Sequence, residues 1–133
     1  MDRSILITGC SSGIGYDAAH GLKARGWRVF ATCRNEVDCE NLRKEGLESF
    51  RLDYDDTTSI QSAVKYILNN NNGVLGALFN NGAFACPGAL EDLPRDALRA
   101  IFERQFTISL DCGFNIAHLV TIILSSGLCF TSM

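Results

Sequence analysis

Short apolar runs alternate with amphipathic segments along the first hundred residues of the chain. Four of these runs suit strands that are buried on both faces, and they occupy residues 4–8, 28–33, 49–52 and 74–79. A segment with apolar residues at helical spacing follows each run, at residues 13–25, 37–45, 58–68 and 94–105. Alternation of this kind predicts an α/β fold in which a parallel sheet is covered by helices on both faces.

Local signals set the expected helix boundaries. The first helix places Ile14, Ala18, Ala19 and Leu22 on one side, and glycine follows it directly at residue 26. We expect Thr58 to cap the third helix and Pro94 to lie in the first turn of the fourth. These residue types favour the starts of helices.

Composition narrows the functional classes. The 133 residues make one domain, and a net charge of −3 gives no electrostatic reason to expect nucleic acid or an anionic membrane as partner. The six cysteines form no Cys-x-x-Cys pair and the two histidines stand alone, so we expect no metal site. The sequence begins without a signal-peptide pattern, and we expect reduced thiols in a cytoplasmic protein.

The charge pattern changes near Gln105. Every Lys and Arg lies at or before Arg104, and Asp111 is the only formal charge after Gln105. We therefore divide the chain into residues 1–105 and an atypical apolar tail, 106–133. The tail is either frame-shifted or truncated sequence, which we favour, or a degenerate fifth strand. A membrane span over residues 113–133 is disfavoured, because polar residues interrupt the segment and no basic residues flank it.

A glycine-rich segment, Thr8-Gly9-Cys10-Ser11-Ser12-Gly13-Ile14-Gly15, lies between the first strand and the first helix. Glycines at such a turn let the backbone approach a pyrophosphate, and the helix N-terminus offers free N–H groups to its oxygens. We expect the segment to bind a dinucleotide. Its candidate cofactor-binding residues are Gly9, Ser11, Ser12, Gly13, Ile14 and Gly15.

This Thr-Gly-x-x-x-Gly-Ile-Gly spacing resembles the cofactor motif of the short-chain dehydrogenase/reductase family. Asp53 resembles the family's acidic residue beside the adenine ring, and Asn80-Asn81-Gly82-Ala83 resembles its Asn-Asn-Ala-Gly with the last two residues exchanged. The resemblance covers residues 1 to about 105. It implies a Rossmann-type doubly wound parallel sheet, truncated here after about four strands, with Asn80 and Gly82 near the cofactor and Asn81 mainly architectural.

The end of the second strand indicates which cofactor is preferred. A Rossmann fold that prefers NAD(H) places a carboxylate there for the ribose 2′-hydroxyl, whereas this chain has Cys33-Arg34. The guanidinium of Arg34 can pair with a 2′-phosphate. NADP(H) is therefore expected, with NAD(H) as the weaker ligand.

The family's chemistry is hydride transfer between the cofactor and a carbonyl or secondary alcohol. In its Tyr-x-x-x-Lys pair the tyrosine serves as acid or base and the lysine lowers the pKa of that tyrosine. This sequence contains no such pair. Gln105 matches the family's relay asparagine and Ser126 is a weak candidate for its substrate-orienting serine, so no catalytic residue is assigned firmly. Two hypotheses stay open: a fragment of an oxidoreductase, inactive alone, or a non-catalytic remnant that binds a dinucleotide or a partner.

The tail also bears on assembly. A complete enzyme of the family is expected to be a homo-oligomer. For this chain we expect an open edge along residues 74–79 and an exposed apolar helix face at Leu98, Ile101 and Phe102. Both features invite association, so the isolated chain is expected to be marginally stable.

Overall fold

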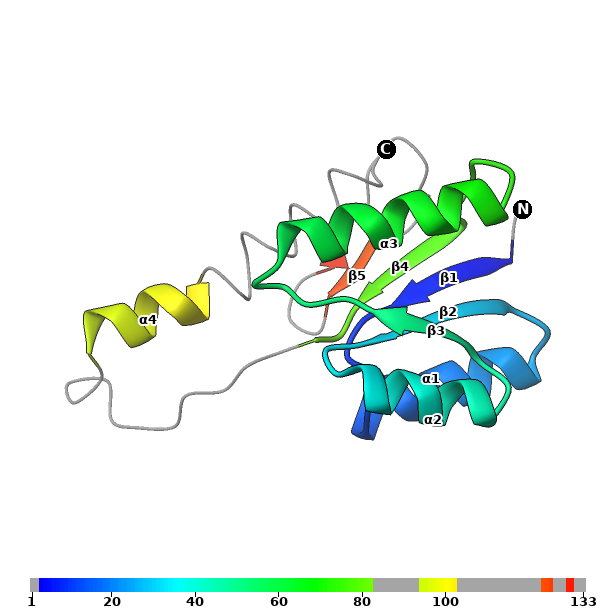
Figure 1. Ribbon diagram of the computed structural model, residues 1–133, viewed down its shortest axis with the longest axis horizontal. Helices are drawn as coiled ribbons and strands as arrows, with labels where there is room; N and C mark the ends of the chain where they lie inside the picture. The colour runs from blue at the N-terminus through cyan, green and yellow to red at the C-terminus, as the bar shows by residue number, and fades with distance from the viewer. Residues whose placement is uncertain (1–2, 83–93, 103–122, 126–128, 131–133) are drawn as a thin grey trace.

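The computed structural model describes residues 3–82, 94–102, 123–125 and 129–130. Its centre is one sheet with the strand order β3-β2-β1-β4-β5-β6, in which only the β5–β6 pair is antiparallel (Figure 1). The strands are β1 (Ser4–Ile7), β2 (Arg28–Cys33), β3 (Glu48–Arg51), β4 (Ala77–Asn80), β5 (Ile123–Ser125) and β6 (Cys129–Phe130).

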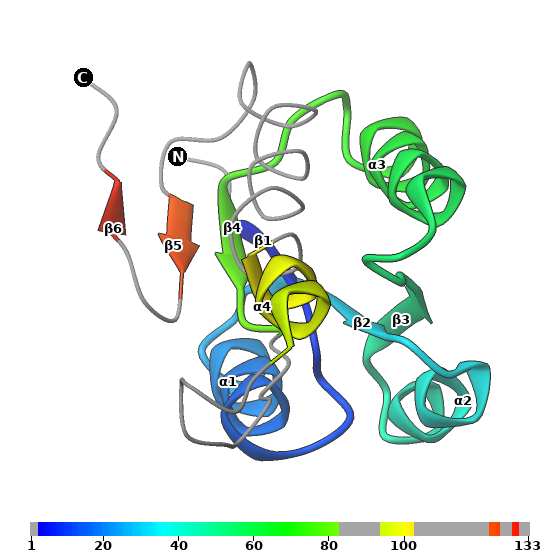
Figure 2. The same ribbon diagram turned by 90° about the vertical axis from the view of Figure 1, so that its left-hand side faces the viewer.

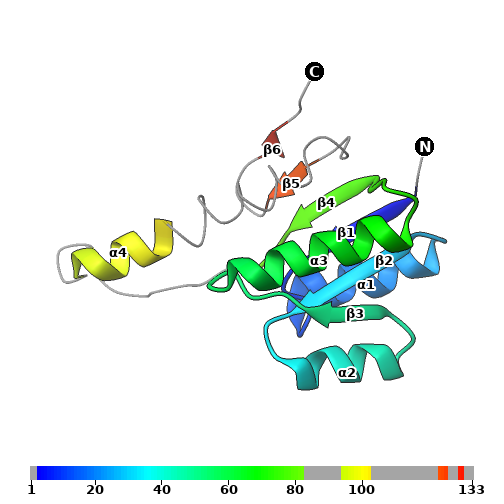
Figure 3. The same ribbon diagram turned by 45° about the horizontal axis from the view of Figure 1, so that its top comes forward.

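Helices cover both faces of the sheet. These helices are α1 (Gly13–Ala24), α2 (Glu36–Lys44) and α3 (Thr57–Asn70), whereas α4 (Arg95–Phe102) lies to one side of the sheet (Figure 1). Figures 1 and 3 show α1 and α2 on one face and α3 on the opposite face. The predicted Rossmann-type α/β arrangement of parallel strands and flanking helices is therefore confirmed.

The two faces have separate apolar cores because side chains alternate along each strand. Ile5 and Ile7 of β1 pack in the cluster that contains Ala19 of α1 and Leu42 of α2. Leu6, between them, packs in the cluster of the α3 face, with residues such as Phe30, Val64 and Ile67. Central strands buried on both sides explain why the sequence shows continuous apolar runs rather than alternation.

Three local expectations were wrong. Helix α3 is capped by Asp56, not Thr58, because the Asp56 carboxylate accepts a hydrogen bond of 3.1 Å from the Ser59 N–H. Ile14 is 72% exposed and does not join the buried side of α1. Strand β4 begins at Ala77, since residue 74 is still part of a turn in which its N–H bonds to the Asn71 carbonyl.

The sheet extends beyond the fourth strand. Leu78, Phe79 and Asn80 of β4 pair in parallel with Ile123, Leu124 and Ser125 of β5, and Figure 2 shows β5 and β6 side by side beyond β4. The expectation of an open edge along residues 74–79 is therefore wrong. Gln105, Ser126, Ala83, most of residues 106–133 and the side chains of Leu98, Ile101 and Phe102 lie outside the described residues.

Among the helices of the described segments, none has the length and apolar character that a bilayer span requires.

Candidate functional site

A cavity of about 490 Å³ lies at the carboxyl ends of the parallel strands. Its lining comes from the segments that follow β1, β2, β3 and β4. After β1 the chain turns to α1 on one face of the sheet, whereas β4 is reached through α3 on the other. Doubly wound folds bind their ligands at this kind of topological switch point. The described lining residues are Thr8, Gly9, Ser11, Ser12, Arg34, Asn35, Asp38, Leu52, Asp53, Tyr54, Asp55, Asn81 and Gly82.

The glycines of the first turn are needed for different reasons. Gly9 has φ +68°, and a Cβ there would lie 2.9 Å from the Gly82 Cα. Gly13 has φ +62°, but a Cβ there would meet no atom within 4 Å. The loop thus packs tightly against residues after β4 at Gly9, while the backbone at Gly13 faces open space. Left-handed φ values favour glycine at both positions.

Asn81 holds this loop in place. Its Nδ2 donates to the carbonyl oxygens of Thr8 and Gly9, each at 3.1 Å. A Cβ on Gly15 would come within 2.5 Å of both that nitrogen and the Gly9 oxygen. The third glycine therefore allows the first turn of α1 to close onto the loop, and Asn81 has the architectural contacts that were expected of it.

Thr8, like Asn81, connects the end of β1 to the segment that follows β4. Its buried hydroxyl oxygen accepts hydrogen bonds from the N–H groups of Asn81 and Gly82, each at 3.0 Å, and lies 2.6 Å from the Tyr54 hydroxyl. The ring of Tyr54 in turn packs closely against Gly82, where an added Cβ would lie 2.9 Å from the ring. Tyr54 was not predicted as a site residue, because its contacts are to segments distant in the sequence.

The N-terminus of α1 is open toward a ligand. Ser12 is the N-cap residue in an extended conformation, its side chain makes no capping hydrogen bond, and the first turn carries no acidic residue. The first N–H groups of a helix lack partners within it and carry the positive end of its dipole. Ser11 and Ser12 line the cavity beside them.

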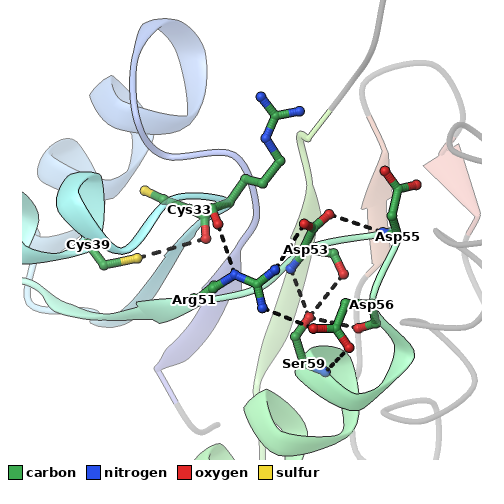
Figure 4. A network of polar contacts seen from close by, with 8 residues as sticks. Cys33, Cys39, Arg51, Asp53, Asp55, Asp56 and Ser59 are labelled. Atoms are coloured by element: carbon green, nitrogen blue, oxygen red, sulfur yellow. Dashed lines mark hydrogen bonds and ion pairs between the residues drawn. The ribbon is translucent and has the colours of Figure 1, made fainter.

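The side chain of Arg51 connects the loops that follow β2 and β3 (Figure 4). Its guanidinium donates to the carbonyl oxygen of Arg34 at 3.2 Å, to Asp53 at 3.1 Å and to Asp56 at 3.0 Å. The other oxygen of Asp53 accepts from the Asp55 N–H at 3.1 Å. The hydrogen bond from Arg51 lowers the pKa of the Asp56 carboxyl, and the Ser59 N–H lowers it further.

Arg34 extends from the segment after β2 and is exposed at the cavity. Within the described part of the chain, its guanidinium forms no hydrogen bond and no ion pair. A cation that lines a cavity without an internal partner is suited to an anionic ligand group.

The thiols of three cysteines, Cys10, Cys33 and Cys39, are buried in the protein. Desolvation raises the pKa of Cys10 to about 12 and also raises that of Cys33. Thiols that stay protonated are poor nucleophiles, so the cluster serves packing. Among the described residues, no group of three or more His, Cys, Asp or Glu side chains is arranged to hold a metal ion.

The structure brings most of the predicted cofactor-binding residues to one cavity. Six of them line it: Gly9, Ser11, Ser12, Arg34, Asp53 and Gly82. Gly13, Ile14 and Gly15 form the first turn of α1 and are not among the described lining residues, and Asn80 is only 3% exposed within β4. We expected Asn80 near the cofactor, but it is the neighbouring Asn81 that lines the cavity.

A glycine turn that leads into an open helix N-terminus, at the switch point of a parallel sheet, is the arrangement of a Rossmann-type α/β fold. The family model for short chain dehydrogenases matches residues 3–124, which extends past Gln105. The chain therefore belongs to the short-chain dehydrogenase family.

Individual relatives agree with this assignment. The chain is 35% identical over 106 residues to the uncharacterized oxidoreductase YbbO of Escherichia coli, and the match covers 80% of this chain and 39% of that protein. It is 33% identical to human retinol dehydrogenase 16, over 93% of this chain and 38% of the relative. An NADPH-bound carbonyl reductase from chicken fatty liver superimposes with a TM-score of 0.79 at 25% identity, over 86% of this chain and 50% of the other. The chain thus spans less than half the length of these two curated relatives.

Proposed function

We propose that the chain binds a nicotinamide dinucleotide in the cavity at the carboxyl ends of β1–β4, and that NADP(H) binds more tightly than NAD(H). The observation that carries this proposal is the glycine turn: the backbone at Gly13, the first residue of α1, faces open space. The cavity volume of about 490 Å³ falls within the range of small-molecule sites.

The residues at the cavity fit the parts of a dinucleotide. The N–H groups at the start of α1, with the hydroxyls of Ser11 and Ser12, would hold the pyrophosphate. Asp53, whose carboxylate is oriented by Arg51 and the Asp55 N–H, would accept a hydrogen bond from the adenine amino group. We place Gly13, Ile14, Gly15, Asn80 and Gly82 around the same ligand by their positions in the family motifs.

The preference for NADP(H) depends on Arg34. Its guanidinium lies at the cavity and forms no internal ion pair among the described residues, so a 2′-phosphate would be its partner. The chicken carbonyl reductase with which the chain superimposes binds NADPH, which supports the same preference.

The reaction that we propose for a protein with the family's full catalytic set is hydride transfer to or from a carbonyl or secondary alcohol carbon. The bound nicotinamide supplies the hydride donor or acceptor. This chain's own contribution is to fix the cofactor. Its 133 residues contain no Tyr-x-x-x-Lys, so we expect the isolated chain to bind without turnover.

Calorimetric titration of the chain with NADPH and with NADH tests the proposal. Arg34→Asp removes a charge-assisted contact and adds repulsion, so NADPH binding should weaken by roughly 2–4 kcal/mol while NADH binding changes little. Lys65→Glu, which exchanges a cation for an acid on the exposed face of α3, is the matched control and should leave both affinities unchanged. Unaltered selectivity in Arg34→Asp would contradict the role of Arg34, and a wild-type chain that binds neither nucleotide would overturn the whole proposal.

A further inference from the structure

Four acidic residues belong to the same region as Arg34, the cation that we assign to the 2′-phosphate. Asp38, Asp53 and Asp55 line the cavity together with Arg34, and Asp56 lies directly behind them at the start of α3. An arginine among several carboxylates would ordinarily pair with one of them, because a charge-assisted hydrogen bond is stronger than a neutral one. Arg34 does not do so within the described residues.

Arg51 pairs with two of these carboxylates instead. It is the last residue of β3 and lies opposite Cys33 in the β2–β3 pair, so its side chain reaches both neighbouring loops. One guanidinium joins Asp53 at 3.1 Å and Asp56 at 3.0 Å, and its single positive charge offsets part of the negative charge of the two carboxylates (Figure 4). Its third contact, to the carbonyl oxygen of Arg34 at 3.2 Å, fixes the backbone that carries the other arginine.

On this basis, and resting on the proposed nucleotide binding, we infer that Arg51 is a positioning residue for cofactor selectivity. It holds Asp53 and Asp56 away from the guanidinium of Arg34 and anchors the Arg34 backbone, so that Arg34 stays available for a 2′-phosphate. Arg51 itself need not contact the cofactor, since it is not among the described lining residues.

Removal of Arg51 should therefore change selectivity and not merely stability. In Arg51→Gln the carboxylates of Asp53 and Asp56 lose their cation, and Arg34, which lines the same cavity as Asp53, becomes a candidate to pair with them. We expect the ratio of NADPH to NADH affinity to fall about tenfold, with most of the loss in NADPH binding. Arg51→Lys keeps the positive charge, but an ammonium group cannot bond three acceptors as the planar guanidinium does. The affinity ratio of Arg51→Lys should therefore lie between those of Arg51→Gln and wild type.

A matched control is Arg28→Gln. Arg28 is equally exposed, bonds both carboxylate oxygens of Glu48 and donates to the Asn70 carbonyl, but it lies at the amino end of β2, away from the cavity. Its loss should lower thermal stability as much as Arg51→Gln does while leaving the affinity ratio unchanged. A merely structural role for Arg51 would give the two variants the same behaviour.

The decisive experiment is a double-mutant cycle on the full chain, in which the two Kd values are measured for wild type, Arg34→Gln, Arg51→Gln and the double variant. If Arg51 acts through Arg34, its substitution no longer alters the ratio once Arg34 is absent. Equal effects of Arg51→Gln in both backgrounds, or none in either, would overturn the inference while leaving nucleotide binding intact. A wild-type chain that binds neither nucleotide overturns the proposed function first, and this inference with it.

Discussion

The hydroxyl groups of Thr8 and Tyr54 lie 2.6 Å apart, and this contact joins the loop after β1 to the loop after β3 across one end of the cavity. Because the Thr8 oxygen also accepts from two backbone N–H groups after β4, three separate βα connections meet at a single buried atom. The shape of the cavity depends on this junction.

Thr8→Val should be costly at that junction. The substitution conserves volume but leaves the N–H groups of Asn81 and Gly82 without their acceptor, and each buried group without a partner costs about 1–3 kcal/mol. We expect a loss of roughly 2–4 kcal/mol in the free energy of unfolding, measured by urea denaturation. Tyr54→Phe removes only one hydrogen bond, so its cost should be about 1 kcal/mol. Equal costs for the two variants would show that the backbone contacts of Thr8 contribute little.

Substitutions of the loop glycines should separate binding from folding. Gly15→Ala places a methyl group 2.5 Å from the Gly9 oxygen and Asn81 Nδ2, so the loop must shift and the fold must weaken. Gly13→Val meets no atom within 4 Å, and its cost to folding is about 1–2 kcal/mol for a left-handed φ.

In the same space, however, the Gly13→Val side chain would obstruct a pyrophosphate, so we expect loss of nucleotide binding with the sheet retained. Circular dichroism and calorimetric titration of the same samples make the comparison. Normal nucleotide affinity in Gly13→Val would mean that the glycine loop is only a turn.

The ion pair between Arg51 and Asp56 predicts a pH dependence of stability in the acid range. The pKa of folded Asp56 is lowered from an ordinary value of 3.8, chiefly by the hydrogen bond from Arg51. A carboxyl with a lowered folded pKa stabilises the protein above its unfolded pKa, and this contribution is lost as the pH falls through the folded pKa.

The contribution of Asp56 is thus present at pH 5 and lost below about pH 4. Asp56→Asn keeps a good N-cap residue but abolishes the titration. We expect its thermal midpoint to lie below that of wild type at pH 6, and we expect the difference to shrink as the pH falls below the ordinary value of 3.8. A constant difference across this range would contradict the assignment.

The buried thiols should resist modification. Burial keeps Cys10 and Cys33 protonated at neutral pH, and Cys39 is equally inaccessible. In a chain with Cys86, Cys112 and Cys129 replaced by Ser, a disulfide reagent at pH 8 should label none of the three within minutes and all three in guanidinium chloride. Rapid labelling of the folded chain would show that the α1–α2 face of the sheet opens.

Much of the α/β framework was predictable from the sequence, because strands buried on both faces leave continuous apolar runs. Residues 28–33 were predicted as a strand and form β2 with the same bounds. The errors arose where neighbouring residues share a chemical preference. Asp56, Thr57, Thr58 and Ser59 can all cap a helix, and only the backbone geometry selects Asp56.

The site was predictable to the extent that it is local in sequence. The glycine turn is one contiguous motif, so its position at the cavity followed from the order of elements. Tyr54 and Arg51 could not be found in this way, because their contacts join segments up to 46 residues apart. The strand that pairs with β4 on its other side was only the alternative that we did not favour, because β5 is three residues long and lies in a tail without a clear pattern.

Every described residue that lines the cavity falls between Thr8 and Gly82, although residues 94–102 and 123–125 are described as well. The described residues that we propose to bind the nucleotide thus belong to one continuous stretch of the sequence. Sequence after this stretch can diverge, or be exchanged by recombination, with little effect on the described walls of the cavity. If the proposed function holds, such an arrangement would allow selection to alter the substrate of the complete protein while the dinucleotide stays the same.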